Sequence, residues 1–207
     1  YKIKKIKNFS NFEPTIVFKS DGIIFFEKQG TLKKYDYSQK LIWKKNFYSK
    51  QEKKSNILLN ITHENDILII TDNLSKYYAV DLKNGELLWS KTNLTPFNSQ
   101  IKIYKDKLYI VDYENILHCF SIKNGNRIWS YQTDNFFVKT KKTLSIVIDN
   151  EKVIFTNSIG DITALDANKG FLLWQTPTQN NLIYAESASL ITSDIVLEKD
   201  SIFFSNN

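Results

Sequence analysis

Four tryptophans recur along the chain at intervals that constrain the fold more than any other feature. They are Trp43, Trp89, Trp129 and Trp174, and their separations are 46, 40 and 45 residues. A fixed period of roughly 40–50 residues is typical of arrays of similar structural units, in which each unit buries its apolar face against a neighbour. The spacing therefore predicts a series of repeats rather than a single irregular core.

The segment that ends at each tryptophan is itself repeated. Residues 78–89 read YAVDLKNGELLW, 118–129 read HCFSIKNGNRIW, and 163–174 read TALDANKGFLLW, whereas 33–43 read KKYDYSQKLIW, one residue shorter. Asp caps a turn with its own side chain, and Gly supplies the positive φ of a tight turn. Each copy is therefore expected to be a hairpin whose second strand runs into the tryptophan.

A second repeated feature precedes each tryptophan by about 22–24 residues, where a polar turn leads into a short apolar run. Another strand-like segment lies before each run, so each period holds about four short strands. Four antiparallel strands per period are typical of a propeller blade. We predict an all-β fold, a β-propeller of four-stranded antiparallel blades. The expected ranges are 1–13 for the last strand of a preceding blade, 14–50, 51–93, 94–134 and 135–180 for four blades, and 181–207 for an incomplete blade.

Composition and charge narrow the classes of partner. No stretch approaches the roughly 20 apolar residues that cross a bilayer, so no transmembrane segment is expected. The net charge is +6, but the basic residues are almost all scattered lysines, and Arg127 is the single arginine. Because base readout depends strongly on arginine, no nucleic-acid partner is expected. The sequence opens at Tyr1 and contains no Met, which predicts a processed chain or a piece of a longer one.

The repeated hairpins resemble the eleven-residue tryptophan-docking motif of PQQ-type (quinoprotein-like) propellers, in which Ala, Asp, Gly and Trp occupy positions one, three, seven and eleven. Two copies are full; the third has Cys and Ser in place of Ala and Asp, and the first keeps only Asp and Trp. The matching residues are Ala79, Asp81, Gly85 and Trp89; Cys119, Gly125 and Trp129; Ala164, Asp166, Gly170 and Trp174; and Asp36 and Trp43.

The resemblance implies one of two functional classes. Quinoprotein dehydrogenases hold PQQ and Ca²⁺ on the propeller axis and use an adjacent cysteine pair, whereas this chain has the single cysteine Cys119 and short loops. The BamB-type outer-membrane lipoproteins are non-catalytic scaffolds with eight blades, and the chain is more similar to them. The resemblance implies four to five blades of an expected eight, no cofactor, an upstream lipid anchor, a periplasmic location and barrel-assembly subunits as partners.

Two other functions stay open at this point. One is a PQQ- and calcium-dependent dehydrogenase whose active site is completed outside this segment, and the other is a propeller that binds a ligand such as a polysaccharide. No zinc-type ligand spacing, phosphate-binding loop or nucleophile elbow occurs in the sequence.

The side chains that could be reactive are expected to have structural rather than catalytic roles. Cys119 occupies the small-residue position of the motif, where a buried small hydrophobe is expected. His118 and Cys119 are neighbours on a predicted strand and point to opposite faces, so they form no catalytic couple. We expect His63 and His118 to be solvent-facing or loop residues, and the recurring Asp81 and Asp166 to be turn caps.

Aromatic residues divide into two groups. Those in the apolar runs are expected to pack in the core, as for Phe25, Phe26, Phe155, Phe203 and Phe204. Others follow the tryptophan units and fit no strand alternation. Among these, Phe97, Phe136 and Phe137 are the candidate partner-binding residues.

Overall fold

The computed structural model describes residues 16–133, 139–140, 142–176, 193–199 and 201–205. It divides into two compact units, residues 1–56 and 57–207. No helix in the described ranges has both the length and the apolar character needed to cross a membrane.

The first unit contains one antiparallel sheet of four strands in chain order. Alternate residues of the second and third strands, including Ile24, Phe26 and Leu32, are buried. This period-two burial is that of strands with one face on a core. The strands are β1 (Val17–Lys19), β2 (Gly22–Glu27), β3 (Thr31–Tyr35) and β4 (Leu41–Asn46), and two short 3₁₀ turns, η1 (Lys28–Gly30) and η2 (Glu52–Lys54), accompany them.

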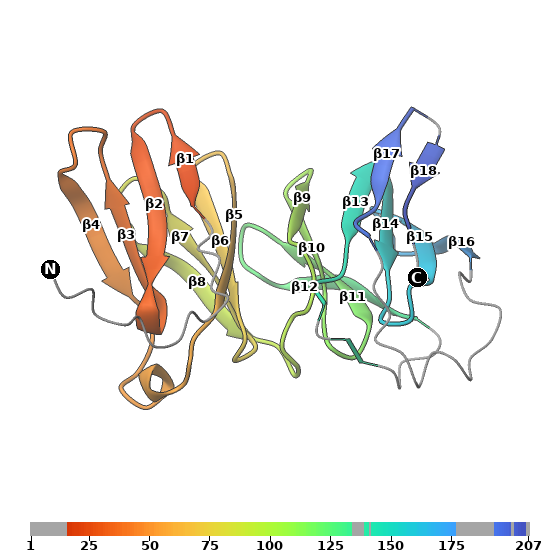
Figure 1. Cartoon of the computed structure of the whole chain (residues 1–207), viewed down its shortest axis with the longest axis horizontal. Coiled ribbons are helices and arrows are strands. Elements are labelled where there is room, and N and C mark those ends of the chain that lie inside the picture. Colours follow the sequence, from red (N-terminus) through yellow and green to blue (C-terminus); the bar gives the residue numbers. More distant parts are fainter. Residues whose placement is uncertain (1–15, 134–138, 141, 177–192, 200, 206–207) are drawn as a thin grey trace, which may run out of the picture. The chain divides into compact units, whose positions relative to one another are not determined.

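The second unit contains three more four-stranded antiparallel sheets and one two-stranded sheet (Figure 1). Each four-stranded sheet is again ordered as the chain runs. The strands are β5 (Leu59–Glu64), β6 (Ile67–Asp72), β7 (Lys76–Asp81) and β8 (Leu87–Thr92); β9 (Lys102–Tyr104), β10 (Lys107–Val111), β11 (Ile116–Ser121) and β12 (Arg127–Gln132); β13 (Ile146–Asp149), β14 (Lys152–Thr156), β15 (Ile162–Asp166) and β16 (Leu172–Thr176); and β17 (Val196–Glu198) and β18 (Ser201–Phe203).

The two middle strands of each four-stranded sheet in this unit are buried on both faces. Strand β10 is buried at every residue after Lys107, and the interior of β11 is buried throughout. A strand covered on both faces reads as a continuous apolar run, which explains the repeated runs in the sequence. The last strands β8 and β12, in contrast, are largely exposed. The central strands of these sheets are therefore covered on both faces, whereas the last strands are open to solvent.

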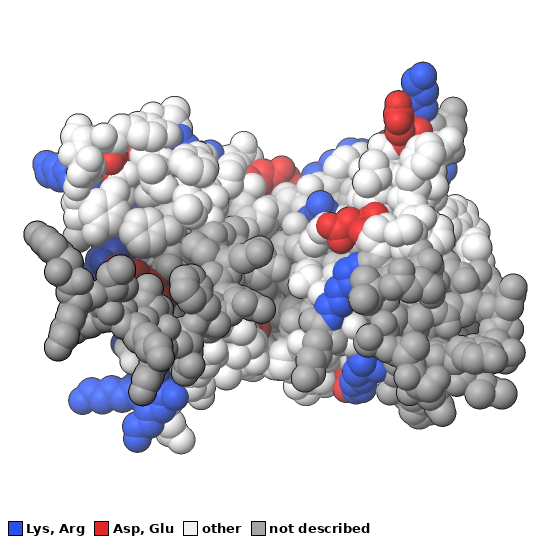
Figure 2. Space-filling view, in the orientation of Figure 1, with Lys and Arg blue, Asp and Glu red and all other residues white. Residues whose placement is uncertain are grey.

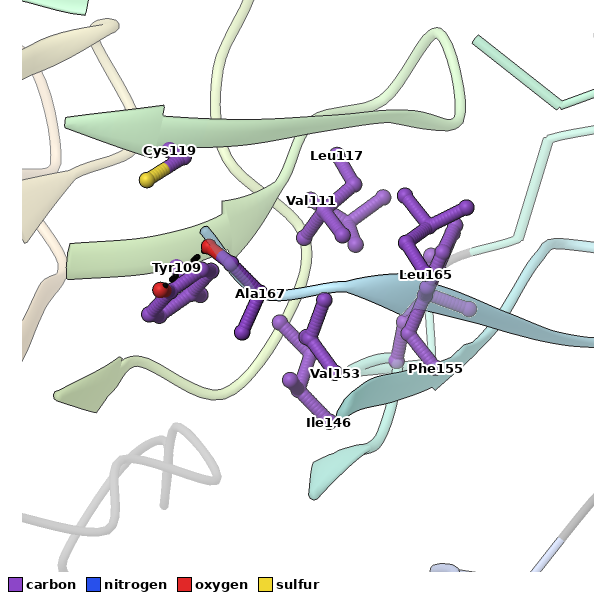
Figure 3. Packing of buried hydrophobic residues seen from close by; sticks show 10 residues of the cluster. Tyr109, Val111, Leu117, Cys119, Ile146, Val153, Phe155, Leu165 and Ala167 are labelled. Carbon is purple, nitrogen blue, oxygen red and sulfur yellow. Dashed lines mark hydrogen bonds between the residues drawn. The ribbon is translucent and has the colours of Figure 1, made fainter. Parts of the chain in front are cut away.

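Apolar clusters fill the spaces between successive sheets. One lies between β10–β11 and β13–β15 and includes Tyr109, Val111, Cys119, Phe155 and Leu165 (Figure 3). Further clusters join the sheet β5–β8 to β9–β12, and β13–β16 to β17–β18. Burial of this kind is the main stabilising contribution to stacked repeats, because no single sheet can cover its own faces.

The predicted all-β class and the four-stranded antiparallel units are confirmed by these sheets. Each four-stranded sheet falls inside one of the four blade ranges expected from the sequence, and β17–β18 falls inside the range 181–207. The strand expected before residue 14 lies outside the described residues.

Two expectations about individual side chains are wrong. His118 is buried within β11 and only 2% exposed, and His63 is a half-buried residue of β5 rather than a loop residue. Phe203 is 55% and Phe204 37% exposed. These two rings are exposed because, in the described part of the chain, β18 pairs only with β17 and no further strand covers that side. Phe26 and Phe155 are buried as expected.

Candidate functional site

The repeated Asp–Gly turn has the same hydrogen bonds in its two full copies. Asp81 Oδ1 accepts the backbone N–H groups of Lys83 at 2.8 Å and Asn84 at 3.0 Å, while Gly85 N–H donates to the Asp81 carbonyl. Asp166 Oδ1 accepts those of the second and third following residues at 2.9 and 2.7 Å, and Gly170 N–H donates to its carbonyl. Both Asp side chains therefore satisfy donors that a tight turn leaves unpaired.

Trp89 and Trp129 of the second unit each lie against the glycine of the following sheet. The Trp89 indole N–H donates to the Ile122 carbonyl at 2.7 Å, and a Cβ on Gly125 would lie 2.6 Å from the Trp89 ring. The Trp129 indole N–H donates to the Asn168 carbonyl at 3.1 Å, and a Cβ on Gly170 would lie 2.6 Å from that ring. The motif thus joins adjacent sheets, with its tryptophan and its glycine in contact with different neighbours.

The small residue of the motif is the cross-strand partner of its own tryptophan. Ala79 pairs with Trp89, Cys119 with Trp129, and Ala164 with Trp174. In all three pairs the register shifts immediately after the small residue, so the strand that carries the tryptophan has one additional residue. A β-bulge of this kind bends the strand and re-aims the adjacent side chain.

The degraded first copy uses different residues for the same turn. Asp36 Oδ1 accepts the Lys40 N–H at 2.9 Å, and Gln39 adopts the positive φ of 65° that glycine would supply. The partner of Trp43 is Lys34 instead of a small residue, and its ammonium donates to Asp21 at 2.7 Å. This hydrogen bond lowers the pKa of Asp21 despite the opposing effect of burial.

Cys119 is buried and free. Burial raises the pKa of its thiol to about 11, so it is protonated at neutral pH. Tyr109, in the same cluster, donates its hydroxyl to the Ala167 carbonyl at 2.8 Å across the sheet junction (Figure 3), and burial raises its pKa as well. A thiol that remains protonated is a poor nucleophile, and these side chains act in packing.

A second polar turn recurs at the same period and was not predicted from the sequence. Asp72 Oδ1, Asp112 Oδ1 and Asn157 Oδ1 each accept backbone N–H groups two and four residues ahead, at distances of 2.8–3.1 Å. The three residues are spaced by 40 and 45 positions, the intervals that separate the last three tryptophans. That coincidence is the sequence signal that could have revealed them.

The residue six positions after each of these turn residues differs between the sheets. It is Tyr78, His118 and Thr163, respectively. In the sheet β9–β12 the resulting pair is an acid and an imidazole: His118 Nε2 lies 2.8 Å from Asp112 Oδ2, and both side chains are nearly inaccessible to solvent. Asp112 Oδ2 also accepts the Thr95 hydroxyl at 2.8 Å.

Burial opposes ionisation of Asp112, but the hydrogen bonds from His118 and Thr95 outweigh it and lower the pKa of the carboxyl group. The folded carboxyl therefore releases its proton more readily than the unfolded one. Its contribution to stability is present above the ordinary carboxyl pKa and is lost as the pH falls through the lowered folded value.

Of the three candidate partner-binding residues, one can be located. Phe97 lies in the connection between β8 and β9, half-buried, with its ring edge-on to Tyr77, His118 and Phe120. It also lines a hollow of about 220 Å³, together with Asn60, Asp72 and Tyr113 among others. Phe136 and Phe137 lie outside the described residues.

Charge and metal-binding groups are dispersed. The face in Figure 2 shows lysine and arginine side chains in several separate places, interspersed with acidic residues. No set of three or more His, Cys, Asp or Glu side chains within the described ranges is arranged to hold a metal ion.

Four-stranded sheets joined through a tryptophan that packs on the next glycine define a β-propeller of the PQQ-type repeat class. The sequence model of the family described as outer membrane protein assembly factor BamB matches residues 28–207, and the chain belongs to that family. The prediction made from the docking motif is thereby confirmed.

Individual relatives agree with this assignment. The outer membrane protein assembly factor BamB of Francisella salina is 25% identical over 162 residues, which cover 67% of this chain and 30% of the relative. That of Shewanella oneidensis is 33% identical over 69 residues, or 33% of this chain and 18% of the relative. The chain thus spans about a third or less of the curated relatives that it matches.

Solved structures show the same fold. The crystal structure of BamB from Moraxella catarrhalis superimposes with a TM-score of 0.71 at 18% identity, covering 93% of this chain and 57% of that one. The computationally designed Ika4 protein superimposes with a TM-score of 0.58 at 11% identity, covering 76% of this chain and 92% of that one.

Proposed function

We propose that the protein is a non-catalytic scaffold of outer-membrane protein assembly, located in the periplasm and held at the outer membrane by an upstream lipid anchor. The family match over residues 28–207 is the observation that carries this proposal. The fold supports it, because rigid stacked sheets present their connecting loops in fixed positions to a partner. The partners are then subunits of the barrel-assembly machinery.

The partner-binding surface is proposed at the connections that follow the tryptophan strands. Phe97 on one such connection is half-buried at the edge of a hollow, where an incoming side chain can be desolvated on several sides. Residues that dominate protein–protein affinity are enriched in aromatic types and cluster in such pockets. Phe136 and Phe137 follow the next tryptophan strand at the corresponding place in the sequence.

The test is co-purification of barrel-assembly subunits with the tagged full-length protein from solubilised membranes. We expect Phe136→Ser combined with Phe137→Ser to reduce the recovered subunits at least about tenfold, since truncating a dominant contact costs 2 kcal/mol or more. Phe171→Ser is the matched control, because Phe171 is 65% exposed and lies immediately before the outer strand β16. Equal recovery from both folded variants would exclude this surface, and no recovery from the wild type would exclude the scaffold.

A separate measurement tests the alternative that the protein is a dehydrogenase. Titration of the full-length protein with PQQ and Ca²⁺, followed by a dye-linked activity assay, is expected to give no turnover. Activity that depends on both additions would overturn the non-catalytic proposal.

A further inference from the structure

The turn of residues 121–126, between β11 and β12, contains the pair Asn124–Gly125, a combination that can modify itself without an enzyme. In such a pair the backbone nitrogen of the glycine attacks the Asn side-chain carbonyl carbon, because glycine has no Cβ to obstruct the approach. The new C–N bond closes a cyclic imide, and the side-chain amide leaves as ammonia. Water then opens the imide, which gives either Asp or its isomer isoaspartate.

The folded turn exposes one of the two reacting groups and withdraws the other. The Asn124 side chain is exposed, so water reaches it, whereas Gly125 is buried. The Gly125 N–H donates to the Ser121 carbonyl at 2.8 Å, and the Asn124 side-chain oxygen accepts the Asn126 N–H at 3.0 Å. To attack, the Gly125 nitrogen must lose its proton and turn toward the Asn124 side chain, and both changes break its hydrogen bond. The folded turn therefore withholds the nucleophile.

The preceding sheet, β5–β8, keeps this turn closed from outside. Trp89 lies against Gly125 and donates its indole N–H to the Ile122 carbonyl at 2.7 Å. Tyr77 donates its hydroxyl to the Gly125 carbonyl at 3.1 Å. Gly125 is thus held through its N–H from within the turn, and through its carbonyl and its bare Cα from the neighbouring sheet. Release of its nitrogen requires a local opening of this contact, of the kind that exposes protected amides to exchange.

We propose that Asn124 is a masked deamidation site, whose reaction requires the contact between Trp89 and Gly125 to open. The overall reaction takes up water, releases ammonia and needs no oxidant or reductant. Where isoaspartate forms, it adds a methylene group to the backbone, so the N–H groups and carbonyls of the turn no longer face their partners. An opening that leads to this product therefore prevents the same contact from re-forming. The inference stands independently of the proposed scaffold role.

Two other turns of the second unit provide internal references. The pair Asn84–Gly85 has the same sequence, and the Gly85 N–H also donates to a carbonyl of its own turn, at 2.9 Å. Because the Tyr77 hydroxyl bonds to Gly125, Asn84 reports on the same chemistry where that hydrogen bond is not involved. In the β15–β16 turn the residue after Asn168 is a lysine, whose side chain obstructs the attack, so Asn168 is expected to react most slowly.

The test is incubation of the full-length protein at neutral pH, followed by peptide mapping that locates the mass increase of an amide converted to a carboxylate. We expect Asn124 in the folded protein to react at least about tenfold more slowly than in a synthetic peptide of residues 118–129, because only the open fraction reacts. Asn168 is expected to stay unmodified over the same period. Equal Asn124 rates in the protein and the peptide would show that the fold does not mask the site.

Two tyrosine variants separate the contact with the preceding sheet from a general loss of stability. Tyr77→Phe removes only the hydroxyl that bonds to Gly125, and the Asn124 rate is expected to rise about two- to tenfold, the effect of losing one hydrogen bond on the open fraction. Tyr109→Phe is the matched control, since its hydroxyl bonds across the next sheet junction, and it should leave the Asn124 rate unchanged. Equal Asn124 rates in the two variants, or a parallel rise at Asn84, refute the proposal.

Should Tyr77→Phe fail to fold, the wild-type protein still decides. Urea below the unfolding transition increases local opening, and hydrogen exchange of the Gly125 amide measures that opening directly. The Asn124 deamidation rate must rise in proportion to this exchange across the urea series. Deamidation that stays constant while the Gly125 amide exchanges faster refutes the masked site.

Discussion

At the sheet junctions, the residue type that a position tolerates depends on the side chain that the neighbouring sheet packs against it. The sequence predicts Gly125 and Gly170 as turn glycines, and both adopt the positive φ expected there. Their second role, as the surface on which the preceding tryptophan lies, depends on the arrangement of two sheets and cannot be inferred from one hairpin. A side chain at either position would occupy the space of the indole ring.

Gly125→Ala should therefore lower the free energy of unfolding by about 1–3 kcal/mol, the usual cost of overpacking a filled site. Its Cβ would lie 2.6 Å from the Trp89 ring while the backbone holds φ at 69°. Denaturant unfolding of the purified protein measures the change. Lys123→Ala, in the same turn but exposed, is the control and is expected to change stability by less than about 0.5 kcal/mol. Equal stability of the two variants would show that the ring can move aside.

His118 shows why some residues cannot be predicted from local pattern. A histidine inside an apolar strand gives no indication of its partner, because Asp112 reaches it across a hairpin rather than along one strand. The periodic occurrence of Asp72, Asp112 and Asn157 is visible in the sequence once the tryptophan intervals are applied to other residue types. The identity of the residue that each turn faces still requires the structure.

At the scale of elements, strand positions were largely predictable because buried strands have continuous apolar runs. Strands β6, β10 and β14 each coincide with such a run. The bulge before each tryptophan was not predictable, because it depends on the pairing register, which shifts after Ala79, Cys119 and Ala164. Turns were predictable in type, since Asp and Gly restrict the conformations available to a tight connection.

Substitutions at Asp166 test whether its side chain stabilises the β15–β16 turn. Asp166→Ala removes the acceptor of two backbone N–H groups and is expected to cost about 1–3 kcal/mol of unfolding free energy. Asp166→Asn should retain most of the stability, because Asn157 accepts two such bonds in another turn. Thermal and urea unfolding compare the variants. Equal losses for Ala and Asn would mean that the negative charge, and not the acceptor geometry, is what stabilises the turn.

At the scale of the molecule, the second unit is a series of sheets in which the same tryptophan–glycine contact recurs between neighbours. Each such contact is called a joint. Gly125 contacts Trp89 in one joint and Gly170 contacts Trp129 in the next, so the two joints share no contacting pair. The stability of stacked repeats is approximately a sum of repeat and nearest-neighbour contributions. The architecture was predictable because the period of the tryptophans identifies the repeat. The partner-binding surface stays a prediction, because Phe136 and Phe137 lie outside the described residues.

Combining Gly125→Ala with Gly170→Ala should give losses that add within about 0.5 kcal/mol. The comparison requires the two single variants and the double variant, each measured by denaturant unfolding under the same conditions. A double variant that loses much more or much less than the sum would show that the sheet β9–β12 transmits strain from one joint to the other.

The two halves of each joint are different, since an indole on one repeat fits a bare turn on the next. A repeat that has both the glycine and the tryptophan carries both halves, one for the neighbour behind and one for the neighbour ahead, whereas the first copy has Gln39 in place of the glycine. Duplicating a single repeat within a gene consequently supplies a complete new joint, and deleting one leaves the flanking repeats able to join. Propellers built on this motif can therefore gain or lose blades while the contact between adjacent blades stays the same.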